Sequence, residues 1–196
     1  MVCFSSILIY QELFLHKIKS STKILIIDYN NNYNDLIENL NIIQEKNIKI
    51  DYINIPENII KNLNKNEENQ NINFYSNNIL TFLTEEKYDN IIFFEIFSKI
   101  NINDMSLHIE KSKELLRSQK YGKIIFINNI ITRYTQYMYH PFSYFRNYLI
   151  DNCVYITDMY DKIRENQLVV LDSYRIFTID FPTYPMEFFS ILCEIK

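Results

Sequence analysis

The chain has 196 residues, which is enough for one domain with a substantial hydrophobic core. Apolar residues make up 47% and charged residues 22%, a balance that argues against overall disorder. The formal charge of −4 excludes binding of nucleic acid through overall charge, although a local basic surface stays open. The three widely spaced cysteines lack metal-ligand spacing and indicate reduced thiols. No apolar run reaches the ~20 residues that span a bilayer, so we expect no membrane contact.

Buried strands and helices alternate along the chain. Apolar runs predict strands at Lys23–Asp28, Ile48–Ile55, Ile72–Tyr75, Asn90–Ile96, Lys123–Asn128 and Val154–Thr157. Helical spacing and start signals predict helices at Phe4–Lys19, Tyr33–Glu45, from Pro56, at Ile79–Glu86, at Met105–Gln119 and from Pro141 to about Asp151. Gly122 is the expected stop of the helix before it, and the polar run Asn62–Gln70 predicts a loop. The end of the chain predicts a helix or loop, then three strands, at Met159–Gln167, Leu168–Leu171, Arg175–Ile179 and Phe188–Ile195.

This alternation is typical of a mostly parallel sheet with helices on both faces. Closely spaced strands at the end of the chain favour one version of it, the Rossmann-like class I methyltransferase fold with an antiparallel last strand. No linker and no internal repeat divides the sequence. We therefore expect residues 1–196 to form a single α/β domain.

A methyltransferase of this class holds S-adenosylmethionine at three loops, and in this sequence all three carry asparagine. The loop after the first strand, normally glycine-rich so that the backbone can approach the ligand, continues from Asp28 into Tyr29 and Asn30–Asn32. Asn54 stands where an acid would hold the ribose hydroxyls, and Asn77 and Asn78 follow the third strand. Part of the asparagine excess can reflect codon bias. We nevertheless interpret Asp28, Asn30, Asn32, Asn54 and Asn78 as a degenerate site that binds no cofactor.

The sequence contains no clear pattern for catalysis of another kind. His16, His108 and His140 fall on or near predicted helices without a neighbouring acid or nucleophile, and packing or surface roles suit them better. Asp158 and Asp161 suit the start of a helix, where acids are favourable. No phosphate-binding, zinc or nucleophile-elbow motif is present.

The segment Arg133–Tyr148 mixes cations with aromatic rings, and Arg133 and Arg146 are its basic residues. Such a mixture suits RNA, because bases stack on rings and arginine contacts phosphate. It equally suits a protein interface, and ordinary packing is as good an interpretation as both together.

Several segments match the motifs of one family. They are Ser5–Tyr10 and Lys23–Tyr33 around the first strand, Leu36–Asn39, Tyr88–Ile96, Gly122–Asn129, Ile163–Val169 with its Arg-Glu-x-Gln pattern, and Phe188–Cys193. Together they resemble the non-catalytic subunit of the eukaryotic tRNA (adenine-N1)-methyltransferase, which modifies the T-loop adenosine. That family carries an N-terminal β-barrel domain, and we expect no counterpart of it in residues 1–196.

The resemblance implies a scaffold that does not catalyse. Such a chain would pair with a catalytic methyltransferase subunit in a nuclear (or cytoplasmic) hetero-oligomer, bind tRNA, and leave S-adenosylmethionine to its partner. It would contact RNA or the partner through Arg164 and Gln167, with Arg133 and Arg146 as further candidates. For Arg164, a surface ion pair with Asp161 or Glu165 is an equal alternative.

Two other readings stay open. One is a Rossmann-like interaction module of a different assembly. The other is an active S-adenosylmethionine-dependent methyltransferase with an atypical cofactor loop. Binding of the cofactor by the chain itself distinguishes the active methyltransferase from the scaffold subunit and from the interaction module.

Overall fold

The computed structural model describes residues 22–29, 47–63, 71–118, 122–131, 154–178 and 186–196. Three helix predictions (Phe4–Lys19, Tyr33–Glu45 and the one after Pro141) lie outside these residues. So do the predicted site residues Asn30, Asn32, Arg133 and Arg146.

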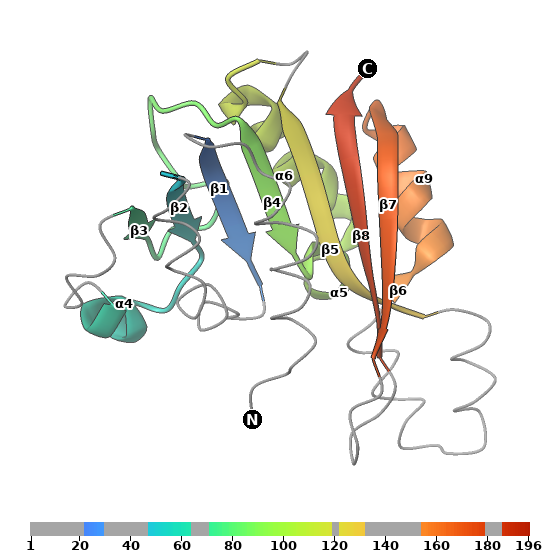
Figure 1. Cartoon of the computed structure of the whole chain (residues 1–196), viewed down its shortest axis with the longest axis horizontal. Coiled ribbons are helices and arrows are strands. Elements are labelled where there is room, and N and C mark those ends of the chain that lie inside the picture. Colours follow the sequence, from blue (N-terminus) through green and yellow to red (C-terminus); the bar gives the residue numbers. More distant parts are fainter. Residues whose placement is uncertain (1–21, 30–46, 64–70, 119–121, 132–153, 179–185) are drawn as a thin grey trace.

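One sheet organises the fold, with strand order β3-β2-β1-β4-β5-β8-β7 and the short β6 beside β5 (Figure 1). Its strands are β1 (Lys23–Asp28), β2 (Lys49–Ile53), β3 (Ile72–Phe74), β4 (Asn90–Phe94), β5 (Lys123–Ile131), β6 (Val154–Tyr155), β7 (Leu168–Thr178) and β8 (Met186–Ile195). The strands β1 to β6 pair in parallel, whereas β8 is antiparallel to both β5 and β7. The predicted fold class, with its antiparallel last strand, is confirmed.

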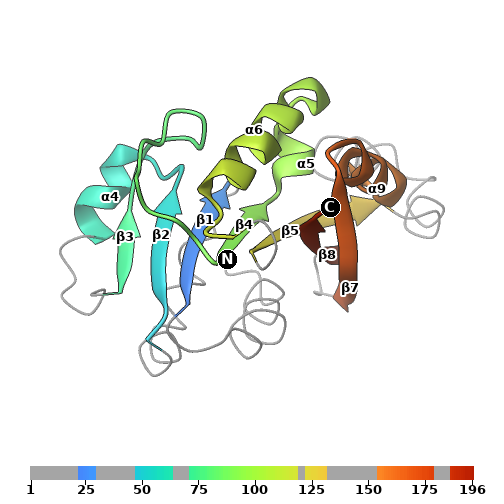
Figure 2. The same ribbon diagram turned by 90° about the horizontal axis from the view of Figure 1, so that it is seen from above.

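Both faces of the central strands are buried, because each face packs against helices. The helices are α4 (Glu57–Leu63), α5 (Ile96–Lys99), α6 (Ile102–Leu115) and α9 (Ile156–Glu165). Figure 2 shows α6 and α9 over the same face of the sheet, and both contribute to one hydrophobic cluster with Leu25 and Phe93. The opposite face carries Ile24, Ile26 and Ile92 and packs against Leu63 of α4. This two-sided burial explains why the parallel strands read as continuous apolar runs.

The helix predicted at Ile79–Glu86 is wrong, because an asparagine turn takes its place. The Asn78 side-chain oxygen accepts hydrogen bonds from the amides of Leu80 (3.0 Å) and Thr81 (3.1 Å). Such local bonds compete with the helical pattern. Ile79 and Phe82 are still buried, so the spacing of three that predicted a helix is produced by a turn instead.

The expected role of Gly122 is also wrong. The helix α6 ends at Leu115, and Gly122 directly precedes β5, with its amide donating to the Ser118 carbonyl at 2.7 Å. A Cβ atom at Gly122 would stand 2.6 Å from that carbonyl oxygen and 2.9 Å from Leu116 Cδ2. The only glycine of the chain therefore permits a close approach of two segments and does not cap a helix.

The remaining differences concern boundaries. The strand β4 ends at Phe94, before the predicted Ile96, because the chain turns at Glu95 and the short helix α5 begins. The continuous apolar run gives no sign of this turn. The two strands predicted at Leu168–Leu171 and Arg175–Ile179 form one long β7, with an irregularity in its pairing between Val170 and Asp172. Among the residues that the structure describes, no helix is long and apolar enough to cross a membrane.

Candidate ligand site at the carboxyl ends of the central strands

The sheet has a switch point between β1 and β4. From β1 the chain proceeds outward to β2 and β3 and then returns to place β4 and β5 on the other side of β1. In open α/β sheets, ligands bind beyond the carboxyl ends of the strands at such a point. The side chains that follow β1, β2 and β4 therefore form the candidate ligand site.

Asp28 ends β1 and organises its neighbours. Its side chain is 1% exposed, and the Tyr52 hydroxyl of β2 donates a hydrogen bond to Asp28 Oδ2. Asn54 Nδ2 donates to the Asp28 carbonyl oxygen at 2.7 Å, and the Asn54 amide donates to the Asn77 carbonyl at 2.9 Å. The structure thus brings together the ends of β1, β2 and β3, as the sequence predicts.

Asn78 does not join this group. Its side-chain oxygen is engaged by its own turn, and the residue is exposed. The Asn54 side chain, by contrast, is positioned to contact a ligand. Its nitrogen donates to the Asp28 backbone carbonyl, and its side-chain oxygen can accept a hydrogen bond from a ligand.

The backbone bends sharply on both sides of Asp28. Asn54 after β2 has φ 72° and Glu95 after β4 has φ 60°, both in the left-handed region. That region is unfavourable for residues with a Cβ atom, asparagine least, and such strain gathers at functional sites. Two of the four left-handed residues in the described ranges therefore directly follow the strands that flank β1 at this end of the sheet, which supports it as the candidate site.

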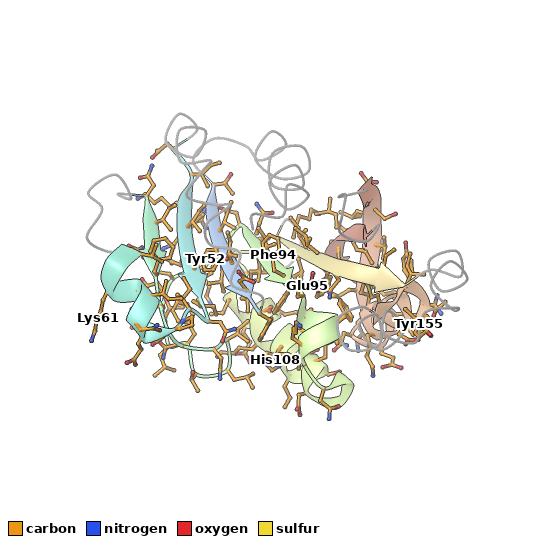
Figure 3. The ribbon with its side chains drawn as sticks, turned by 90° about the horizontal axis from the view of Figure 1, so that it is seen from below. Tyr52, Lys61, Phe94, Glu95, His108 and Tyr155 are labelled. Atoms are coloured by element: carbon orange, nitrogen blue, oxygen red, sulfur yellow. The ribbon has the colours of Figure 1, made fainter. Side chains whose placement is uncertain are left out.

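Glu95 is 3% exposed at the carboxyl end of β4. Its amide donates to the Ile127 carbonyl at 2.8 Å, and its Oε2 accepts from Asn128 Nδ2 of β5 at 3.3 Å. Figure 3, seen from below, shows Phe94 and Glu95 at the end of β4, with His108 of α6 nearby. A second buried acid therefore stands one strand away from Asp28.

Tyr29 joins β1 to β4 and α6. Its amide donates to the Phe94 carbonyl at 3.2 Å, and its ring meets His108 edge to face, with centroids 6.2 Å apart. The Tyr29 hydroxyl is closed off from solvent and has no hydrogen-bond partner in the part of the chain that the structure describes. Burial raises the pKa of Tyr29, so the hydroxyl keeps its proton and acts as a donor.

His108 packs in the interior, in line with its sequence-based interpretation. Its Nδ1 lies 2.8 Å from the Asp104 carbonyl, which can only accept. Nδ1 therefore carries a proton and donates to this carbonyl.

The predicted contact residues lie elsewhere. Arg164 is exposed on α9 and lies 3.9 Å from Asp161, and Gln167 follows that helix with φ 56°. In Figure 1, α9 and β7 lie at the opposite edge of the sheet from β3, away from the switch point. The structure adds Tyr29, Glu95 and Asn128 to the site. Of these only Glu95 had a signal in the sequence, as the lone acid at the end of an apolar run.

Comparison with solved structures finds methyltransferases. A SAM-dependent methyltransferase from Methanosarcina mazei aligns with TM-score 0.70 at 10% identity, over 94% of this chain and 97% of the other. The N-methyltransferase NodS from Bradyrhizobium japonicum, in complex with S-adenosyl-L-homocysteine, gives 0.63 at 13% identity over 97% and 84%. Magnesium protoporphyrin IX methyltransferase from Synechocystis, with bound SAH, gives 0.64 at 11% identity over 96% and 80%. The class shared with these proteins is the class I methyltransferase fold.

No protein-family model and no curated protein sequence matches the chain. The likenesses are at 13% identity or below, so they define the fold and leave the tRNA methyltransferase resemblance as a prediction.

Two expectations are corrected by these comparisons. The chain was expected to be a pseudo-enzyme, whereas the structures that share its fold are methyltransferases. It was expected to leave the cofactor to a partner, whereas NodS and the protoporphyrin enzyme hold SAH on the chain that carries the fold. The asparagines at the cofactor loops led to both errors, because a missing glycine or acid removes one contact and leaves the rest of a site in place.

The residues present fit S-adenosylmethionine. The carboxyl groups of Asp28 and Glu95 suit a ligand with sulfonium and ammonium charges. The Asn54 carbonyl oxygen can accept from one ribose hydroxyl, and the unpartnered Tyr29 hydroxyl needs an acceptor.

Proposed function

We propose that this chain is an S-adenosylmethionine-dependent methyltransferase that binds the cofactor itself through an asparagine-rich loop set. The observation that carries the proposal is the convergence of Asp28, Asn54 and Glu95 at the switch point, two of them with left-handed backbone. The cofactor, when bound, supplies a methyl group to an acceptor nucleophile. The shared fold of the solved methyltransferases supports the same conclusion.

The roles of the chain's own residues follow from their contacts. The backbone carbonyl of Asp28 accepts from the Asn54 side-chain nitrogen and so holds that side chain in place. The side-chain oxygen of Asn54 then accepts from a ribose hydroxyl. Tyr52 fixes the Asp28 carboxyl group from β2. Asn128 holds Glu95 at the end of β4.

The test measures binding of S-adenosyl-L-homocysteine to the full chain by isothermal titration calorimetry. We expect saturable binding, with Asn54→Gly about tenfold weaker because a hydrogen-bond acceptor is lost while the left-handed backbone is kept. Asn47→Gly is the matched control. Asn47 has φ 50° at the amino end of the same strand, away from the site, so its affinity should equal the wild-type value. A wild-type chain that shows no binding at millimolar ligand would overturn the proposal.

The resemblance also implies tRNA as a bound partner, a hetero-oligomeric assembly and a nuclear (or cytoplasmic) location. These rest on the matched motifs alone and stay predictions. Co-purification of tRNA with the full chain, read out by sequencing, checks the first of them.

A further inference from the structure

Tyr29 occupies the junction of three elements at the switch point. It directly follows Asp28 of β1, its amide is tied to Phe94 of β4, and its ring meets His108 of α6. The ring packs against the hydrophobic cluster on that face of the sheet. In the ligand-free chain the side chain is therefore held by backbone and packing contacts with described residues, none of which uses its hydroxyl.

The hydroxyl is the one enclosed side-chain polar atom, within the described ranges, that has no partner. An enclosed donor without an acceptor destabilises a fold, and such exceptions require an explanation. A phenylalanine would pack the same ring without that cost. The hydroxyl is explained if its acceptor arrives with a ligand.

The other polar side chains near the hydroxyl define what that acceptor is. Asn54 and Asn128 each donate one side-chain N–H, to the Asp28 backbone carbonyl and to the Glu95 carboxyl group respectively. The two acids suit the cationic groups of the cofactor and repel its carboxylate. Among the described residues, the Tyr29 hydroxyl is the donor of this group that makes no hydrogen bond at all, so it is available to a carboxylate.

We propose that the Tyr29 hydroxyl donates a hydrogen bond to the carboxylate at the amino-acid end of S-adenosylmethionine and its product S-adenosyl-L-homocysteine. This rests on the proposed function. The side chain as a whole is half-buried, and its hydroxyl is enclosed in the ligand-free chain. Cofactor entry therefore includes a rotation of the Tyr29 side chain about its Cα–Cβ bond, which brings the hydroxyl to the carboxylate.

The experiment compares two probes on the full chain by calorimetry. S-adenosyl-L-homocysteine carries the amino-acid end, whereas 5′-methylthioadenosine keeps the adenosine and the thioether but lacks it. We expect Tyr29→Phe to weaken binding of the first about tenfold and leave binding of the second unchanged, because only the first offers the carboxylate. Tyr155→Phe, an exposed tyrosine of β6, is the control and should change neither affinity.

Thermal unfolding of the ligand-free variants separates binding from structure. The midpoint of Tyr29→Phe should equal or exceed the wild-type midpoint, since an unpaired enclosed hydroxyl is removed. A lower midpoint, an equal loss for both probes, or no loss for either would each overturn the inference while the proposed function stands. A wild-type chain that binds neither probe would overturn both.

Discussion

The hydrogen bond from Tyr52 to Asp28 joins two buried polar groups across neighbouring strands. Both residues lie in the interior, and Asp28 also anchors Asn54 through its carbonyl oxygen. Removing one donor from an enclosed carboxyl group leaves part of its desolvation uncompensated. Tyr52 is also among the largest fully buried side chains of the protein, so its ring contributes to packing independently of its hydroxyl.

The variant Tyr52→Phe isolates the hydroxyl, because the ring and its packing are kept. We expect it to lower the free energy of unfolding by about 1–3 kcal/mol, measured by urea denaturation. Tyr155→Phe provides the comparison, since an exposed hydroxyl contributes within about 0.5 kcal/mol. Equal unfolding free energies for the two variants would show that the bond to Asp28 contributes nothing to stability.

Sequence reasoning found part of this site and missed the rest for a physical reason. Asp28 and Asn54 were predictable because each ends an apolar strand, and the carboxyl ends of parallel strands meet at one edge of the sheet. Tyr29 was not, because a buried hydroxyl without a partner is a tertiary property and the chain has 16 tyrosines. Glu95 was visible in the sequence only as the lone acid at the end of an apolar run, because the run conceals the turn that places it at the site.

At the scale of elements, the central parallel strands were predictable, whereas the helix predicted at Ile79–Glu86 does not form. The bounds of β1 match the predicted Lys23–Asp28, since six consecutive residues with a continuous apolar centre bury both faces. The segment after Asn78 has the same apolar spacing as a helix. In this segment the Asn78 side chain takes the amides of Leu80 and Thr81 as hydrogen-bond donors and favours a turn over a helix. The spacing of apolar residues carries no information about such side-chain bonds.

The asparagine turn can be tested with two adjacent residues. Asn78→Ala removes the oxygen that accepts from Leu80 and Thr81, so we expect a loss of about 1 kcal/mol in unfolding free energy. Asn77→Ala is the control. Asn77 is exposed, and the bond it makes to Asn54 comes from its backbone carbonyl, which alanine keeps.

Hydrogen exchange locates the effect of these variants. Amides of residues 79–86 should exchange faster in Asn78→Ala than in Asn77→Ala, because the turn opens locally. Equal exchange in both would mean that burial of Ile79 and Phe82 holds the segment without the turn.

At the scale of the molecule, the strand order joins distant parts of the chain. The last strand, β8, lies between β5 and β7, and the register places Cys193 between Ile124 and Val170. The alternation of elements predicted a parallel sheet, but it could not predict which strands are neighbours, because the contacts that decide this are far apart in sequence. The same insertion encloses Cys193 completely.

This enclosure links the stability of the whole fold to alkaline pH. Burial raises the pKa of the Cys193 thiol from 9.0 to about 12. In the unfolded chain the thiol therefore ionises near pH 9, whereas in the folded chain it stays protonated. Unfolding releases a proton in this range, so stability is fully present below pH 9 and falls as the pH rises toward 12.

The measurement is the unfolding free energy by urea between pH 8.5 and 10. One such group contributes a fall of up to about 1.4 kcal/mol per pH unit. Tyr88 and Tyr29 also have raised pKa values, through burial first, and for Tyr88 also through its hydrogen bond to Asp51. They add to the fall above about pH 10, where unfolded tyrosine ionises. In Cys193→Ser the hydroxyl does not titrate, so the curve should be flatter below pH 10, with Cys3 and Cys153 unchanged in both proteins. Identical slopes for the two proteins would show that Cys193 reaches solvent in the folded chain, and that β8 does not stay closed between β5 and β7.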